Sequence, residues 1–264
     1  MTEATVLLTR HASVATITLN RPAARNALDT RTKVALLEAL DGVSSDPAVR
    51  CVVLIGSGQA FCAGQDLKEH QATLAEGDLD ALWRTVPEHY NKIATLLATT
   101  AKPVVAAVNG VAAGAGAALA LLADYRLVAD SAGINVAFGR IGLSCDTGTS
   151  WTLPRLVGPT RAMELLLSGR TVPAAEALSI GLASEVVADA SFAQRLDELA
   201  STLAQGPTLA YAAMRQSVSF AATHSLAESL SNEAEQMRRT GASADHAAAV
   251  RAFVDRRRPQ FSGR

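Results

Sequence analysis

The chain has 264 residues, of which 49% are hydrophobic, and this is enough to form a core without metal ions or disulfide bonds. Its formal net charge of −1 leaves it without the broad positive field with which proteins bind nucleic acid or anionic membranes. The three cysteines are scattered and odd in number, which favours reduced thiols in the cytoplasm over a disulfide framework.

Signals for export, membrane insertion and metal binding are also missing from the sequence. The N-terminal segment alternates polar and apolar side chains and lacks the basic start and continuous apolar stretch of a signal peptide. The longest apolar run, 111–123, is shorter than the ~20 residues that cross a bilayer. The five histidines form no close pair with one another or with a cysteine. We therefore expect no membrane span and no metal site.

Strands and helices are predicted to alternate through the first 190 residues. Residues 14–19 alternate between two faces, which is typical of a half-buried strand. Asp29 and Thr30 then begin a helix that runs to about Ser44. Its apolar face is expected to contain Val34, Leu37, Leu40 and Val43. The segments expected next are a strand at 51–55, a glycine-rich loop at 56–64, a helical region at 78–99, a strand at 104–108, a Gly/Ala-rich loop with a short helix ending near residue 123, and strands at 125–129 and 134–138.

The composition changes near residue 191, where alanine-rich amphipathic segments replace the strands. Helices are predicted at 191–205, 208–222, 225–239 and 243–254, with breaks at glycine and proline between them. Regular alternation of strands and helices before this point predicts an α/β fold. We therefore divide the chain into an α/β core, residues 1–190, and a C-terminal helical region, residues 191–264.

Two loops rich in small residues are candidates for the chemistry. The segments AFCAGQDL (60–67) and VNGVAAGAGAAL (108–119) each follow a predicted strand and lead into a helix. Small side chains let a ligand approach the backbone, and two main-chain N–H groups that converge on one carbonyl oxygen form an oxyanion hole. Tight turns and close helix packing explain each loop equally well by itself. Neither loop has the spacing of a dinucleotide or P-loop motif.

Together with NRPAARNAL and LPRLVGPTRAMELLLSGRTVPAAEALSIGLASEVV, these loops make the sequence resemble the crotonase, or enoyl-CoA hydratase/isomerase, superfamily over nearly its whole length. The resemblance implies a spiral of ββα units with a C-terminal α-helical trimerisation region, and trimers that often pair into hexamers. It also implies an acyl-coenzyme A (acyl-CoA) thioester as substrate. No separate cofactor is expected, because coenzyme A is part of that substrate.

The resemblance assigns roles to individual positions. It implies that the main-chain N–H groups of Gln65 and Ala115 form the oxyanion hole, and either side chain is compatible with this role. Coenzyme A and the acyl group are expected to contact residues of the two loops, of the ARNAL segment and of the C-terminal tail, whose aromatic residue can reach a neighbouring subunit's adenine. These residues are Ala24, Arg25, Leu28, Ala63, Gly64, Asp66, Lys68, Gly114 and Phe261. Without the motifs, Arg25 and Lys68 are interpreted as solvated surface charges.

The sequence departs from the two-glutamate hydratases of this superfamily. The positions of those glutamates fall on Ala118 and Phe138, which cannot transfer a proton. One carboxylate remains at Asp146, in a run that resembles the ring-degradation and dienoyl-CoA isomerase branches, where an aspartate acts as acid and base. We therefore predict an acyl-CoA double-bond isomerase with Asp146 as its proton shuttle. The alternative role for Asp146 is to cap the helix that passes through Trp151.

Two other functions stay open at this point. One is hydration or another enolate reaction that uses an acid from residues 66–90, where Glu69, His70 and His89 lie. The other is a non-catalytic protein that binds acyl-CoA after losing the two glutamates.

Overall fold

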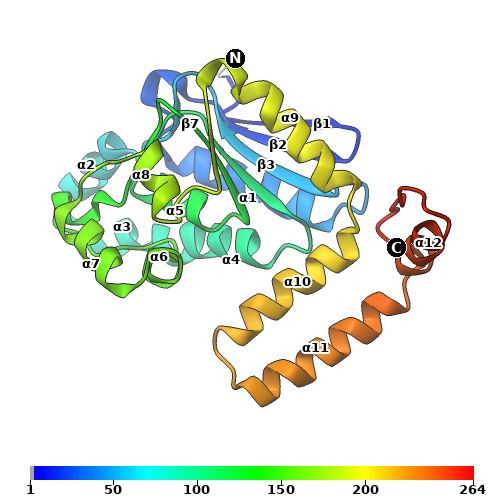
Figure 1. Cartoon of the computed structure of the whole chain (residues 1–264). Coiled ribbons are helices and arrows are strands. Elements are labelled where there is room, and N and C mark those ends of the chain that lie inside the picture. Colours follow the sequence, from blue (N-terminus) through cyan, green and yellow to red (C-terminus); the bar gives the residue numbers. More distant parts are fainter. Residues whose placement is uncertain (1–2) are drawn as a thin grey trace.

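A six-stranded sheet forms the centre of the fold, and the computed structural model describes residues 3–264 (Figure 1). From one edge to the other, its strands are β1 (Val6–His11), β2 (Val14–Leu19), β3 (Cys51–Gly56), β5 (Val104–Val108), β7 (Tyr125–Ala129) and β10 (Glu185–Val187). β1 runs antiparallel to β2, and the other neighbours are parallel. The inner strands β3 and β5 are almost entirely apolar, because helices or loops cover both of their faces.

A second sheet of four very short strands lies beside the first. Its strands are β4 (Ala60–Cys62), β6 (Val111–Ala113), β8 (Gly133–Asn135) and β9 (Val172–Pro173), and β8 runs antiparallel to β9. β4 and β6 fall inside the segments predicted as loops, because two or three residues among glycines show no period. β3, β4 and the helix α2 (Leu67–Ala75) follow one another, as do β5, β6 and α5 (Ala115–Leu121). These are two of the expected ββα units.

The remaining core helices surround the sheets. They are α1 (Thr30–Ser45), α3 (Leu79–Thr85), α4 (Asn91–Thr99), α6 (Thr149–Val157), α7 (Pro159–Ser168) and α8 (Ala174–Ser179), with short turns η1 (Pro22–Ala24), η2 (Val86–Tyr90, π-helical) and η3 (Ala137–Ile141). The helical region predicted at 78–99 is therefore three consecutive elements. The strand predicted at 134–138 is wrong in its second half, because β8 ends at Asn135 and the chain turns into η3.

Helix α1 begins as predicted but buries a different face. The Asp29 carboxylate accepts a hydrogen bond from the main-chain N–H of Thr32 at 2.8 Å, which caps the helix. Val34 is 39% exposed, whereas Lys33 is 1% exposed. Residue 33 lies on the same face as the buried residues 36, 40 and 43, so the predicted stripe was displaced by one residue at its start. A lysine at such a position requires polar partners inside the protein.

The four C-terminal helices agree with the prediction to within two residues at each end. They are α9 (Asp189–Gln205), α10 (Thr208–Ala221), α11 (Leu226–Gly241) and α12 (Ala244–Val254). α9 packs on the large sheet and contributes Phe192 and Leu196 to the main core. Figure 1 shows α10 and α11 as an antiparallel pair that extends away from the sheet, with α12 near its end. The division of the chain at residue 190 stays a prediction.

Two further features concern cysteines and membranes. Cys51 and Cys62 lie in the core, and burial raises the pKa of each thiol to about 12, so neither is a ready nucleophile at neutral pH. Within residues 3–264, no helix combines the length and the apolar character that crossing a bilayer requires.

Candidate active site

A cavity of about 210 Å³ lies where the two small-residue loops meet the loop that contains Asp146. Gln65, Gly114, Ala115 and Asp146 all line it, so the structure brings together the residues predicted to carry the chemistry. Its apolar lining includes Leu67, Trp83, Val86, Phe138, Ile141 and Leu143. A larger groove of about 590 Å³ lies between the core and α10, but it contains none of the predicted site residues.

Residues 63–65 and 113–115 line one side of the cavity, and we call this side, together with the adjoining Gly116, the glycine wall. Gly64 has φ +86°, and a Cβ atom there would lie 2.7 Å from the carbonyl oxygen of Ala113 and 3.3 Å from the nitrogen of Ala115. A Cβ atom at Gly116 would lie 2.3 Å from the carbonyl oxygen of Cys62. Glycine is therefore required for the two backbones to approach this closely.

The main-chain N–H of Gln65 is directed by a short parallel bridge. The N–H of Leu28 donates to the oxygen of Gly64 at 2.7 Å, and the N–H of Asp66 donates to the oxygen of Leu28 at 3.1 Å. In such a bridge the N–H of the central residue points away from the partner segment. Among residues 3–264, no acceptor for the N–H of Gln65 or of Ala115 is found. Two main-chain N–H groups without protein acceptors on one cavity are donors of the kind that an oxyanion hole uses.

Three polar side chains from different elements also line the cavity: Thr85, Tyr90 and Asp146, which we call the polar wall. The Asp146 carboxylate accepts a hydrogen bond from the Thr147 hydroxyl at 2.8 Å. Burial raises the pKa of Asp146, against the opposing effects of the Thr147 hydroxyl and the charge of Lys33. The N-cap of α6 is Gly148, so the alternative role of Asp146 as a helix cap is wrong. Among the described residues that line the cavity, Asp146 is the sole carboxylate.

A buried polar cluster supports the polar wall from behind, and the sequence reasoning missed it. The Lys33 ammonium donates to Thr85 Oγ1 at 2.7 Å and to Gln65 Oε1 at 3.2 Å. The Tyr90 hydroxyl donates to the same Gln65 oxygen at 2.6 Å. Burial lowers the pKa of Lys33, whereas nearby carboxylates, with Glu69 foremost, act to raise it. The sequence did contain one signal for this cluster, because Lys33 falls at helical spacing with the apolar positions 36, 40 and 43.

The ARNAL segment lies beside the first loop. The N–H of Ala63 donates to the oxygen of Arg25 at 3.0 Å, and Asn26 holds the turn through its buried amide, which donates to the oxygen of Ala60 at 2.8 Å. Arg25 and Asn26 both have positive φ, a strained conformation that this network maintains. Arg25 is exposed and Ala24 half-buried, but Leu28 has no exposed surface, so its side chain belongs to the core.

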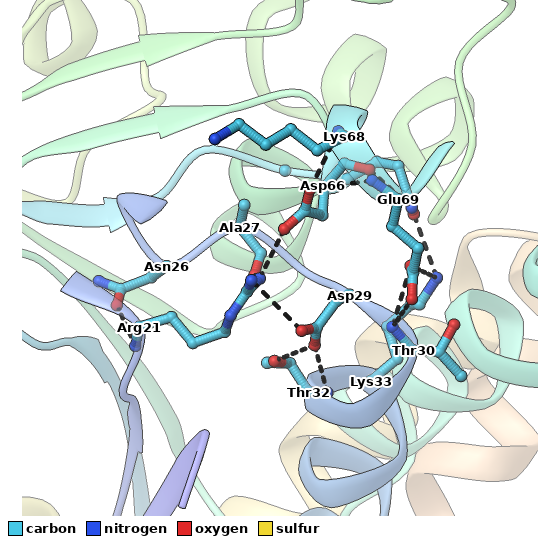
Figure 2. Close-up of polar contacts among 12 residues, drawn as sticks. Arg21, Asn26, Ala27, Asp29, Thr30, Thr32, Lys33, Asp66, Lys68 and Glu69 are labelled. Carbon is cyan, nitrogen blue, oxygen red and sulfur yellow. Dashed lines mark hydrogen bonds and ion pairs between the residues drawn. The ribbon is translucent and has the colours of Figure 1, made fainter. Parts of the chain in front are cut away.

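Asp66 has a clear structural role at the start of α2, shown in Figure 2. Its carboxylate accepts hydrogen bonds from the main-chain N–H of Lys68 at 3.0 Å and from the Arg21 guanidinium at 2.8 Å. Burial acts to raise the pKa of Asp66, but the hydrogen bonds from Arg21 and the main chain outweigh it and lower the pKa. The exposed Lys68 side chain points away from this network (Figure 2).

The C-terminal tail is bound to its own chain. Arg50 donates to the carbonyl oxygen of Phe261 at 2.9 Å, and the buried Asp245 carboxylate accepts the main-chain N–H of Ser262 at 2.6 Å and of Gly263 at 2.8 Å. The expected contact of Phe261 with an adenine involves a neighbouring subunit, and it stays a prediction.

Comparisons with known proteins identify the family of the chain. A family model described as enoyl-CoA hydratase/isomerase matches residues 9–264. The chain belongs to the enoyl-CoA hydratase/isomerase family. It is 41% identical to the 1,2-epoxyphenylacetyl-CoA isomerase of Escherichia coli over 95% of each chain.

Solved structures of the family confirm the predicted fold class. A crystal structure from Mycobacterium abscessus that is assigned to enoyl-CoA hydratases/isomerases matches with a TM-score of 0.94 and 43% identity, covering 98% of this chain and 100% of the other. An enoyl-CoA hydratase from Mycobacterium smegmatis matches with a TM-score of 0.90 and 31% identity over 98% and 99% of the two chains. The chain is an enzyme of this family, and both isomerases and hydratases are among its relatives.

Proposed function

We propose that this enzyme is an acyl-CoA double-bond isomerase that uses Asp146 as its only proton shuttle. The observation that carries the proposal is the position of one half-buried carboxylate on the same cavity as two main-chain N–H groups without protein acceptors. Phe138 lines the cavity where the family's hydratases have a glutamate, and Ala118 is buried in α5. This arrangement supports a reaction that needs a single acid and base.

The reaction moves one proton along the acyl chain. The Asp146 carboxylate removes a proton from Cα of a Δ3-enoyl thioester, and the bonding electrons become a dienolate whose thioester oxygen is held by the N–H groups of Gln65 and Ala115. Asp146 then returns the proton to Cγ, and the double bond lies at Δ2. Burial raises the pKa of Asp146, which makes its carboxylate a stronger base for removal of the Cα proton.

We propose that coenzyme A binds along the ARNAL segment and the first loop, where the backbones already lie side by side. Arg25 is exposed there, and Lys68 extends into solvent, so both are able to reach phosphate groups without breaking a buried contact. The residues proposed to contact the substrate are Ala24, Arg25, Leu28 through its backbone, Ala63, Gly64, Asp66, Lys68 and Gly114, with Phe261 from a neighbouring subunit.

The deciding experiment is turnover of Δ3-enoyl-CoA by the Asp146→Asn variant. We expect kcat to fall by at least ~100-fold, since asparagine keeps the shape but cannot accept a proton. Asp197→Asn, an exposed aspartate on α9, is the matched control and should leave kcat unchanged. If the Asp146→Asn variant keeps the kcat of the wild-type enzyme, Asp146 is not part of the mechanism.

Hydration is the second candidate, because His70 also lines the cavity and hydratases are among the relatives. His70 contacts Trp83 edge to face, with ring centroids 5.6 Å apart, so a second acid–base group is within the same enclosure. Reaction in ¹⁸O-labelled water separates the two activities, because hydration incorporates solvent oxygen and isomerisation does not. Tight acyl-CoA binding without any turnover across chain lengths would instead favour a binding protein.

We further propose that the chain assembles into trimers or hexamers through α10, α11 and α12. Large apolar side chains are exposed on these helices, among them Val218 at 74%, Met237 at 72% and Phe253 at 84%. Such a concentration on one part of the surface is typical of a covered interface. Light scattering coupled to gel filtration measures the assembly, and a monomer at micromolar concentration would contradict the proposal.

A further inference from the structure

Two of the four lysines of the chain are buried, and they lie at opposite ends of α1. The Lys102 ammonium donates to the carbonyl oxygens of Ser44 at 3.0 Å and Asp46 at 2.7 Å, and also to that of Val43. These carbonyls belong to the last turn and the C-cap of α1, where a cation stabilises the helix directly. Lys102 is therefore explained by the fold. Lys33, at the other end, has no such explanation.

The partners of Lys33 are side chains that line the cavity. Its ammonium contacts Gln65 Oε1 and Thr85 Oγ1, and it lies 5.4 Å from the centroid of the Tyr90 ring. A carboxylate oxygen of Glu69 is 3.9 Å away. Lys33 itself does not line the cavity. Burying an ammonium is costly, and a methionine would fill a similar volume without that cost.

We propose that Lys33 is a positioning residue of the proton transfer, which fixes the Gln65 and Tyr90 side chains and supplies a stationary positive charge for the anion in the cavity. This inference rests on the proposed isomerase function. It assigns no contact with substrate to Lys33, and it gives α1 a role beyond packing.

The positioning argument starts from Gln65, whose N–H is the proposed oxyanion donor. Its backbone is held on one side by the bridge to Leu28. Its side-chain oxygen is held on the other side by two donors, the Tyr90 hydroxyl and the Lys33 ammonium. An N–H group that is fixed before the reaction needs no reorganisation when negative charge develops on the thioester oxygen.

The charge argument concerns the sum of charges in the cavity. Before proton transfer the negative charge is on Asp146, and afterwards it is on the thioester oxygen, so the cavity holds one negative charge throughout. A fixed cation behind the wall stabilises this charge in both positions, and its field reaches Asp146. Removal of the cation should destabilise both the ionised Asp146 carboxylate and the enolate.

The other ionisable groups near the cluster do not replace Lys33. Asp29 and Asp66 are paired with Arg21, at 3.3 Å and 2.8 Å. Glu69 accepts the main-chain N–H of Thr30 at 3.0 Å. The remaining groups are His70 on α2, His89 on η2 beside Thr85, and the exposed Arg140 on η3. Within the described residues, Lys33 is the one buried cation that contacts the polar wall.

The test compares Lys33→Met with the matched variant Lys102→Met. The first readout is the ¹³C NMR titration of the Asp146 carboxyl group in ligand-free protein, assigned with Asp146→Asn. The second is the pH dependence of kcat and kcat/KM with Δ3-enoyl-CoA. We expect Lys33→Met to move the Asp146 midpoint to higher pH, because the positive charge is lost, and to lower the plateau kcat by about 10-fold, because the Gln65 N–H is held less firmly. Lys33→Arg should restore part of both, because it returns the charge and a hydrogen-bond donor.

Lys102→Met should lower thermal stability and leave the Asp146 titration and the pH profile unchanged. If Lys33→Met, like Lys102→Met, changes thermal stability but neither the Asp146 titration nor the pH profile, Lys33 is structural and the inference is overturned. If Lys33→Met does not fold, Lys33→Gln provides the same test with a polar, uncharged side chain. If wild-type protein does not isomerise any Δ3-enoyl-CoA, the proposed function fails, whereas the NMR titration still decides whether Lys33 controls the charge on Asp146.

Discussion

The glycine wall and the polar wall line the same cavity but are built by different means. In the glycine wall, two backbones touch because Gly64 and Gly116 have no Cβ atoms, and the chemistry comes from main-chain N–H groups. In the polar wall, Thr85, Tyr90 and Asp146 come from three separate elements, and Lys33 supports them from behind. One wall is a property of the backbone, and the other is a property of side chains.

This difference predicts opposite responses to mutation. The N–H donors of the glycine wall belong to the backbone, but any added atom at its glycines forces the two loops apart. The polar wall tolerates small changes of shape but loses its chemistry when one functional group is removed. Stability should therefore report on the first wall, and kinetics on the second.

The largest effect is expected for Gly116→Ala. A Cβ atom there would lie 2.3 Å from the oxygen and 2.7 Å from the Cβ of Cys62, so α5 must move. We expect the free energy of unfolding to fall by about 3 kcal/mol, and turnover to fall with it because the N–H of Ala115 is displaced. Urea unfolding followed by circular dichroism measures the loss.

Gly42→Ala is the matched control, because Gly42 is an exposed glycine of α1 where an added Cβ atom would meet no neighbouring atom within 4 Å. Alanine should stabilise this helix by ~0.5–1 kcal/mol. Equal effects of the two substitutions would show that the glycine wall is not closely packed, and that helix propensity alone decides.

A smaller loss, of about 2 kcal/mol, is expected for Asp66→Ala, at the point where α2 leaves the glycine wall. The substitution removes the helix cap and leaves Arg21 without one of its two carboxylate partners. Asp66→Asn keeps an acceptor for the cap and should lose about half as much. Affinity for free coenzyme A, measured by calorimetry on both variants, tests the proposed contact of Asp66 with coenzyme A. Unchanged affinity in Asp66→Asn and Asp66→Ala would make Asp66 purely structural.

The fold was largely predictable because its long elements carry clear periods. The inner strands are continuous apolar runs, and α9–α12 repeat at helical spacing, so both were located closely. β4 and β6 were not, because three residues in a glycine-rich loop gain their strand geometry from pairing with neighbours rather than from their own pattern.

The residues of the two walls also differed in how well the sequence predicted them. Gln65, Ala115 and Asp146 were named from their motifs, and the structure brings them to one cavity. Thr85 and Tyr90 were not named, because they lie in a polar stretch without a period, and Lys33 was hidden by assigning the helix face one residue too far along. Side chains that act through tertiary contacts leave little local signal in a single sequence.

Tyr90→Phe should reduce kcat by about 5-fold, which corresponds to about 1 kcal/mol for one lost hydrogen bond to Gln65. The ring and its contact with Lys33 are kept, so KM should change little. Tyr125→Phe is the matched control, since the Tyr125 hydroxyl on β7 donates to Glu185 on β10 at 2.7 Å. This variant also loses one hydrogen bond, but it should leave kcat unchanged. A kcat effect of the same size in both variants would argue against a specific role for the polar wall.

The smallest effect expected is a gain in stability for Asp146→Asn. Burial raises the pKa of Asp146 in the folded state, so the folded protein binds this proton more tightly than the unfolded chain does. Wild-type protein therefore loses stability as pH rises from the unfolded pKa, about 3.9, through the folded one, and asparagine avoids this loss. The variant should have the higher Tm at pH 7, and the difference should disappear toward pH 4.

Asp66→Asn should behave in the opposite way, because the pKa of Asp66 is lowered in the folded state. Its ionised carboxylate stabilises the fold above the unfolded pKa, and this contribution is lost as pH falls through the folded pKa. Asp66→Asn should accordingly have the lower Tm at pH 7. Thermal scans of both variants from pH 4 to pH 8 compare the two signs directly. A Tm at pH 7 that falls in both variants would mean that Asp146, like Asp66, is held by interactions that favour its charge, and that the polar wall is built for stability rather than for proton transfer.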